Sequence, residues 1–148
     1  MAVLAIASLS NAPFAAADPS DKLRAAVSAM RGTSCGALQS NPIVEQAADQ
    51  FGQADDEWIE RRTRAVPVEI AVAAGAPPDA IPLLTDLGYE TGKAAVVYGA
   101  AATEADSIQA LLLQGYAKIP DCSYTVFGAS TLHNSSKDLI LTTVVLAA

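Results

Sequence analysis

The stretch Thr103–Leu132, TEADSIQALLLQGYAKIPDCSYTVFGASTL, decides the fold class of this chain. Thr103 suits the N-cap of a helix, and Asp106 follows three residues later in an acidic variant of the capping box. Apolar residues then recur at helical spacing over 108–112, and Pro120 is expected to end the helix. The stretch therefore predicts a capped amphipathic helix that stops sharply at a proline.

A strand is predicted directly after that helix, over Tyr124 to Thr131. There Tyr124, Val126, Gly128 and Ser130 alternate with Thr125, Phe127, Ala129 and Thr131, so that each set would lie on one face of the strand. His133 to Asp138 is a polar segment and predicts a turn. The apolar run Leu139 to Ala147, LILTTVVLA, predicts a central strand covered on both faces. The chain is therefore expected to end in a β-hairpin.

Two helices are predicted in the first half of the chain. Asp18 and Pro19 indicate the start of the first, and Gly32 its end. Its expected buried stripe consists of Leu23, Ala26, Val27 and Met30. The second begins at Asn41-Pro42, a cap followed by proline. Its expected apolar face consists of Val44, Ala47, Ala48, Phe51, Ala54, Trp58 and Ile59.

The middle of the chain is less regular. Prolines and alanines between Val66 and Pro82 predict a loop, followed by a short helix over Ile81 to Leu87 that stops at Gly88. Lys93 to Ala100 predicts a short strand. Helices come first and strands gather at the end, so the pattern indicates an α+β domain with helices packed on a small antiparallel sheet.

Residues 1–17, MAVLAIASLSNAPFAAA, are predicted to be a signal peptide, and residues 18–148 a single domain. The apolar run ends in small residues before Asp18 and is shorter than the roughly 20 residues that a membrane span needs. No Lys or Arg precedes it, which indicates that translation starts further upstream. The mature chain is therefore expected to be secreted or to belong to the cell envelope, without a transmembrane segment.

The chain has two cysteines, Cys35 and Cys122, and export predicts that they form one disulfide. Such a bridge would close a loop of almost ninety residues and stabilise the fold by roughly 4–5 kcal/mol in the chain-entropy model. No C-x-x-C motif occurs, and the single histidine is near neither cysteine in sequence. A redox or metal role for the cysteines is not predicted.

Composition and motifs exclude several classes of function. The net charge of −7 argues against nucleic acid as a partner. No G-x-S-x-G motif occurs, and His133 is expected to be a surface turn residue, not a member of a catalytic triad. Asp55, Asp56, Glu57 and Glu60 are expected to form a solvated helix face, with Glu57 and Glu60 pairing to Arg61 and Arg64. The residues predict no metal site, cofactor or catalytic group.

Three stretches together resemble the secreted CAP superfamily (cysteine-rich secretory proteins, antigen 5 and pathogenesis-related 1 proteins), in the compact form that actinobacteria export. They are LRAAVSAMRGTSCGALQSNPIVEQAADQF (23–51), the helix that runs into IPDCSYTVFGAS (119–130), and the terminal LTTVVLA (141–147). They cover about half of the mature chain. The resemblance implies a three-layer α-β-α sandwich around a twisted antiparallel sheet.

The chain departs from this family at the metal site. The family's cleft usually carries two histidines and two acids, yet here no histidine stands in either helix. Gly115 or Tyr116 occupies the position where one would precede the I-P-D-C segment, and no G-E-N stretch occurs. The resemblance therefore implies a degenerate CAP-like domain without the metal-binding tetrad, and no metal-dependent activity is carried over.

Three functions follow as hypotheses. The first is an exported, non-enzymatic binding or interaction module, whose segment Val66 to Pro82 borders an apolar groove for a lipid or sterol-like ligand, as some CAP members bind. The second is a secreted hydrolase with paired carboxylates such as Asp121 and Asp138, which a glycosidase mechanism needs within roughly 5–10 Å of each other. The third is a cell-wall interaction protein with no pocket.

Overall fold

The computed structural model describes residues 17–62 and 78–148 of the chain. The predicted signal peptide lies outside these residues except for Ala17, as does most of Val66 to Pro82. The elements are α1 (Asp21–Arg31), β1 (Gln39–Ser40), α2 (Pro42–Arg62), α4 (Ile81–Asp86), β2 (Ala94–Ala101), α5 (Glu104–Gln114), β3 (Val126–Asn134) and β4 (Leu139–Ala147).

The four strands form one sheet in the order β1-β3-β4-β2. The long strands β2 and β3 both pair antiparallel with β4, over Ala94–Ala101 and Val126–Asn134 respectively. The two-residue strand β1 pairs parallel with Val126 and Phe127. The expected antiparallel sheet is therefore correct for the three long strands, and the short parallel strand β1 makes the sheet mixed.

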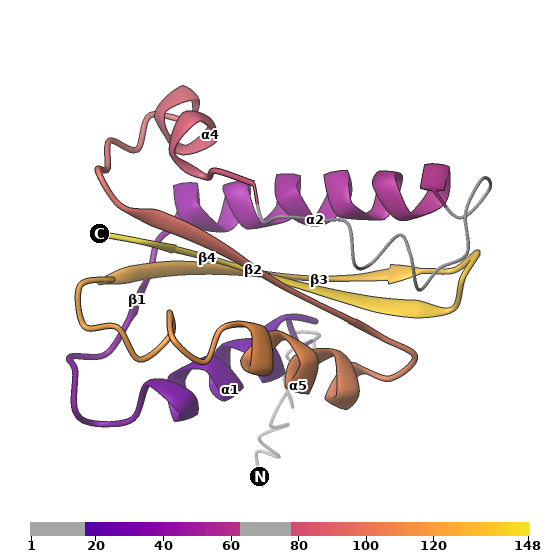
Figure 1. Cartoon of the computed structure of the whole chain (residues 1–148), viewed down its shortest axis with the longest axis horizontal. Helices are drawn as coiled ribbons and strands as arrows, with labels where there is room; N and C mark the ends of the chain where they lie inside the picture. Colours follow the sequence, from indigo (N-terminus) through magenta and orange to yellow (C-terminus); the bar gives the residue numbers. More distant parts are fainter. Residues whose placement is uncertain (1–16, 63–77) are drawn as a thin grey trace, which may run out of the picture.

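Helices cover both faces of the sheet, which gives three layers (Figure 1). The helices α2 and α4 lie on one face, where Val44 and Leu84 pack with Val96 and Val145. The helices α1 and α5 lie on the other, where Leu23 and Leu111 join a cluster that contains neighbouring residues of the same strands, such as Val97, Val144 and Leu146. Because successive strand residues point to opposite faces, each of the three long strands supplies residues to both clusters.

The strand β4 is the central element, as its uniformly apolar sequence predicts. Every residue from Leu141 to Ala147 is buried. One glycine on each neighbouring strand lets a helix approach closely: a Cβ on Gly128 would collide with the carbonyl oxygen of Val44 in α2. A Cβ on Gly99 would likewise collide with the carbonyl oxygen of Ser107 in α5. These contacts fix how near the outer layers lie to the sheet.

The helix starts follow local chemistry. Asn41 caps α2 as predicted, because its Oδ1 accepts hydrogen bonds from the N–H groups of Ile43 and Val44 at 2.9 and 3.3 Å. Thr103 caps α5 by accepting from the N–H of Asp106 at 3.2 Å. The predicted start of α1 at Asp18 is wrong, since Asp18 Oδ1 accepts from the N–H of Ser20 and closes a turn first.

Three further expectations need correction. The helix α5 ends at Gln114, not at Pro120, and the chain between them forms turns. The strand β3 continues through His133 to Asn134, so the turn of the hairpin is shorter than predicted. Ala54, expected on the apolar face of α2, is exposed. In each case the local sequence pattern predicts the wrong boundary or face, because contacts with other elements determine it.

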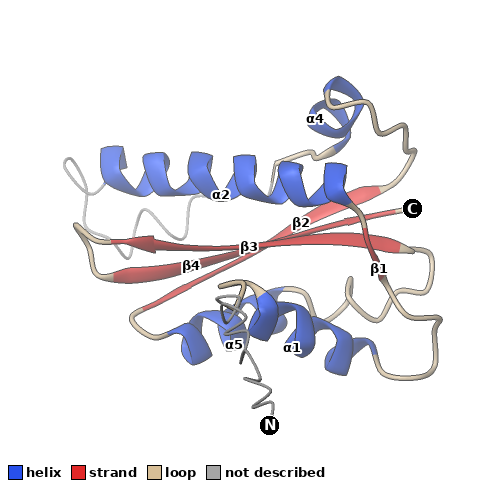
Figure 2. Ribbon diagram, turned by 180° about the vertical axis from the view of Figure 1, so that it is seen from behind, coloured by secondary structure: helices blue, strands red, loops and turns tan. Residues whose placement is uncertain are grey.

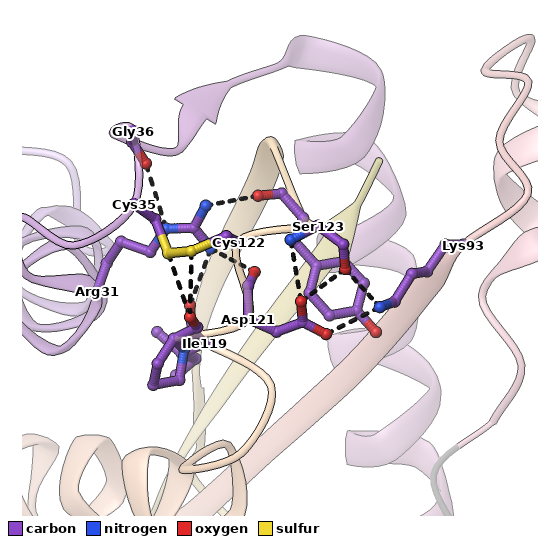
Figure 3. The surroundings of a disulfide bond; sticks show 10 residues. Arg31, Cys35, Gly36, Lys93, Ile119, Asp121, Cys122 and Ser123 are labelled. Carbon is purple, nitrogen blue, oxygen red and sulfur yellow. Dashed lines mark hydrogen bonds and ion pairs between the residues drawn. A yellow bond between two sulfur atoms is a disulfide. The ribbon is translucent and has the colours of Figure 1, made fainter.

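The predicted disulfide between Cys35 and Cys122 is present, with a Cα–Cα distance of 5.2 Å. Beside it lies Arg31, whose side chain is buried at the end of α1 (Figure 3). Its guanidinium donates hydrogen bonds to the carbonyl oxygens of Gly36, Ile119, Asp121 and Tyr124, at 2.7 to 3.2 Å. The disulfide and this arginine therefore join the same two connections, α1–β1 and α5–β3.

We expect the paired substitution Cys35→Ser and Cys122→Ser to lower the free energy of unfolding by about 4–5 kcal/mol, because the unfolded chain regains the freedom of a loop with a sequence separation of 87. Urea denaturation of the oxidised protein and the variant measures this difference. An unchanged urea midpoint would contradict it.

We expect Arg31→Met to cost about 3 kcal/mol, because charge-assisted bonds of about 1.5–3 kcal/mol each are lost and water regains only part of them. Arg61→Met is the matched control, since Arg61 is exposed and pairs only with Glu57 among the described residues. Thermal unfolding of both variants checks the prediction. Equal shifts in Tm would show that the buried carbonyl bonds do not matter.

Candidate functional site

The candidate site lies along β3, where the sheet has an open edge. The strand β1 ends at Ser40 because Asn41 caps α2 and Pro42 has no N–H with which to continue the ladder. The last main-chain bond between these segments runs from the N–H of Asn41 to the carbonyl oxygen of Phe127, at 3.2 Å. Within the described ranges, no strand pairs with this side of β3 beyond Phe127.

The free edge presents backbone groups at regular intervals. Successive residues of a strand direct their N–H and C=O groups to opposite sides, and those of Phe127 face β1. The N–H and C=O groups of Ala129, Thr131 and His133 therefore face the same open side. The other edge of the sheet differs, because the N–H of Tyr98 in β2 donates to Gln114 Oε1 at 2.5 Å.

In Figure 2, β3 runs between α2 and α1, and β1 lies beside it only at one end. Two adjoining cavities lie along the free edge of β3. The larger has a volume of about 540 Å³ and lies between the segment 17–24, the α2 residues Glu45 and Asp49, and β3 residues 129–132. The smaller, of about 410 Å³, extends along β3 to His133 and reaches Glu104 of α5. We call the two together the edge groove.

Charged residues surround the edge groove. Arg24 is central: its Nε and Nη2 donate to Glu45 Oε1 at 2.9 and 2.7 Å, and its Nη1 lies 3.3 Å from Asp18 and 3.2 Å from Asp21. Lys22 pairs with Glu104 at 2.9 Å. The lining residues include the five carboxylates of Asp18, Asp21, Glu45, Asp49 and Glu104. Two cations oppose them, so the groove carries an excess of negative charge.

A buried hydroxyl lies at the centre of this edge. Thr131 lines both cavities, and its Oγ1 has no hydrogen-bond partner in the described part of the chain. Thr143 on β4 has a second such hydroxyl, which lies against α2 near Gly52. Buried hydroxyls without partners cost free energy, so a polar group bound beside Thr131, the one of the two that lines the cavities, would be stabilising.

The acidic cluster in α2 is not the solvated face that the sequence predicts. Asp55 is partly buried, and burial together with the nearby charge of Asp56 raises the pKa of its carboxyl to about 6. Burial, with the charge of Asp55 beside it, also raises the pKa of the Tyr98 phenol above its usual range. Only the pairing of Glu57 with Arg61, at 3.5 Å, is as expected. Arg64 lies outside the described residues.

The other two acids of that cluster hold the hairpin. The side-chain amide of Asn134, which is buried, donates to Asp56 Oδ1 at 2.7 Å and to Glu60 Oε1 at 2.9 Å. Ser136 Oγ also donates to Glu60. Asn134 therefore anchors the β3–β4 turn under α2.

Asp121 and Asp138, the example pair of the hydrolase hypothesis, are too far apart to act as a glycosidase pair. Asp121 lies before the start of β3 and Asp138 lies in the turn after its end, so nine strand residues, about 30 Å, separate them. A glycosidase pair needs roughly 5–10 Å. Asp121 instead pairs with Lys93 at 2.8 Å, and this bond holds its pKa well below the usual range (Figure 3). His133, near Asp138 at 3.2 Å, is exposed as predicted.

The positions that the CAP resemblance singles out do not form a metal site. Gly115 is buried at the end of α5, whereas the exposed fraction of Tyr116 is 70%. Across residues 17–62 and 78–148, no group of three or more metal-ligating side chains is gathered. In the same ranges, no helix is both long and apolar enough to cross a bilayer.

Comparison with known proteins gives no relative: the chain matches no protein-family model, no curated protein and no solved structure. The CAP resemblance therefore stays a prediction from sequence motifs. The residues of the edge groove were not predicted as a site. The one available signal is Asn41-Pro42, which ends β1 after two residues, but sequence alone does not show which strand lies beside it.

We expect Asp55→Asn to raise the stability of the protein at pH 7 but not at pH 4. A pKa of about 6 in the folded protein, against 3.8 in the unfolded chain, means that the folded state binds more protons between these values. Its stability therefore falls as pH rises through that window, by about 1–2 kcal/mol after allowance for partial exposure.

Urea denaturation from pH 4 to 7 tests this, and Asp49→Asn, an exposed aspartate in the same helix, is the control. Parallel pH profiles for Asp55→Asn and the unsubstituted protein would contradict the prediction.

Proposed function

We propose that this protein is an exported, non-enzymatic binding module that holds its ligand in the edge groove of β3. The observation that carries the proposal is the edge of β3 that pairs with no described strand beyond Phe127, with its adjoining cavities framed by charged residues. Its backbone donors and acceptors are fixed by the sheet, so a ligand that pairs with them meets groups that are already oriented. Loops and edges held by a rigid scaffold are common binding sites.

Export is supported by the disulfide. A bridge between Cys35 and Cys122 persists in an oxidising compartment, and reducing conditions in the cytosol disfavour it. The signal peptide over residues 1–17 is part of the proposal. The staple and Arg31 lie at the opposite end of β3 from the hairpin turn, so the groove belongs to a strand whose start is held firmly.

A CAP-like identity is also part of the proposal. The order of layers, with helices on both faces of a sheet, supports it, and so do the three stretches of sequence that resemble the family. The apolar-ligand version depends on Val66 to Pro82, of which only the last residues are described. The charged lining of the larger cavity supports a polar ligand there.

A four-compound panel tests this proposal: arginine amide, glutamate, N-acetylglucosamine and palmitate, each titrated into ¹⁵N-labelled protein and followed by amide NMR. We expect arginine amide to shift the amides of residues 129–132 and 45–49, because the groove has excess negative charge. Asp49→Asn should weaken these shifts, and Asp86→Asn, an exposed aspartate in α4 that lines neither cavity, should not.

Shifts by palmitate at other residues would favour the apolar-ligand hypothesis instead. The absence of groove shifts with all four compounds would overturn the proposed function.

A further inference from the structure

We infer that the ligand of the edge groove is an extended, basic polypeptide segment that joins the sheet as a strand beside β3, an inference that rests on the proposed function. It rests on the position of the β3 edge, which pairs with no described strand beyond Phe127, between two acidic walls. One wall consists of Glu45 and Asp49 of α2, and the other of Asp18, Asp21 and Glu104. Strand addition of this kind draws affinity from main-chain hydrogen bonds and selectivity from alternate side chains.

The edge offers enough outward-facing backbone groups to pair with a short peptide. From Gly128 to Asn134 the strand β3 continues for seven residues after β1 stops. Every second residue, namely Ala129, Thr131 and His133, directs its N–H and C=O to the open side. An added strand of about five to seven residues would therefore make main-chain bonds in the place where a longer β1 would lie, at the usual spacing of about 4.8 Å.

Over residues 128–134, the edge of β3 lacks three of the devices that normally block such pairing, namely proline, lysine and a bulge. Edge strands are commonly protected by proline, lysine, a bulge or a covering side chain. The β2 edge has one of these, the amide oxygen of Gln114 on the N–H of Tyr98. Over residues 128–134, β3 contains no proline or lysine, and it pairs with β4 residue for residue without a bulge.

Charge selects the kind of peptide. Alternate side chains of an added strand point to opposite faces of the sheet. On one side they would meet Glu45 and Asp49 of α2. On the other side they would meet Asp21 and Glu104, the first residues of α1 and α5. The lining has five carboxylates against Lys22 and Arg24, an excess of three negative charges, so lysine or arginine is favoured at both sets of positions.

The same charge argues against a second copy of this chain as the occupant. Pairing β3 with the β3 of another molecule would bring two acidic walls together, and the whole chain carries a net charge of −7. A positively charged partner of a different kind fits the edge better.

The test uses the full chain and three seven-residue peptides of alternating residues: lysine with valine, glutamate with valine, and the lysine peptide N-methylated at every second amide. We expect the lysine peptide to bind, with NMR shifts centred on the amides of Ala129, Thr131 and His133. The N-methylated peptide should bind at least about tenfold more weakly, because it lacks half of its main-chain donors. The glutamate peptide should not bind measurably.

Two pairs of substitutions in the protein separate the backbone contribution to binding from the charge contribution. Thr131→Pro removes the outward N–H without touching the β4 ladder, since proline is tolerated where the N–H faces solvent, and it should abolish binding. Thr131→Val keeps the N–H and removes only the hydroxyl, so it should bind much more tightly than Thr131→Pro, and the difference between the two variants measures the contribution of the backbone N–H. Asp49→Lys should weaken binding roughly fivefold, and Asp86→Lys, with the same change in net charge, should not.

Three outcomes would overturn the inference. The first two are that the glutamate peptide or the N-methylated peptide binds as tightly as the lysine peptide. The third is that the NMR signals of these amides shift with protein concentration alone, which would make a second copy the occupant. If Thr131→Pro does not fold, the N-methylated peptide still decides. Groove shifts with arginine amide but none with any peptide would remove this inference and leave the proposed function intact.

Discussion

Burial of β4 from Leu141 to Ala147 is the constraint on which the rest of the structure depends. A strand without a polar face has to be covered on both faces, so two helical layers are needed and β2 and β3 must lie on either side of it. The polar exceptions on this strand are Thr142 and Thr143. Thr142 Oγ1 bonds with Ser107 at 3.0 Å, whereas Thr143 Oγ1 has no partner among the described residues. The sheet thus tolerates one costly group at its centre.

The two ends of β3 are held by different kinds of interaction. At its start, a covalent bridge and the buried cation of Arg31 tie the preceding connection to the end of α1. At its end, Asn134 is held by carboxylates of α2, in a polar cluster next to the partly buried Asp55. Between these anchors, the outer edge of β3 beyond Phe127 has no strand beside it within the described ranges. A fixed strand with a free edge can accept another polypeptide at little conformational cost.

The proposed activity follows from that combination rather than from a catalytic constellation. The acids that the sequence brings close together are used in structure: Asp56 and Glu60 hold Asn134, and Asp121 pairs with Lys93. The carboxylates of the edge groove come instead from three separate helices and the segment before α1. Such a site presents charge around an exposed backbone, which suits recognition of an extended chain.

The sequence by itself determined the elements whose causes are local. Caps at Asn41 and Thr103, the apolar run of β4 and the cysteine pair are properties of short stretches or of composition, so the α+β class and the disulfide could be predicted. Tertiary structure alone decided that β1 stops beside β3, that Asp55 is partly buried, and that Asp121 and Asp138 lie at opposite ends of a strand. These depend on which surfaces pack together, and periodicity within one segment carries no information about its distant neighbours.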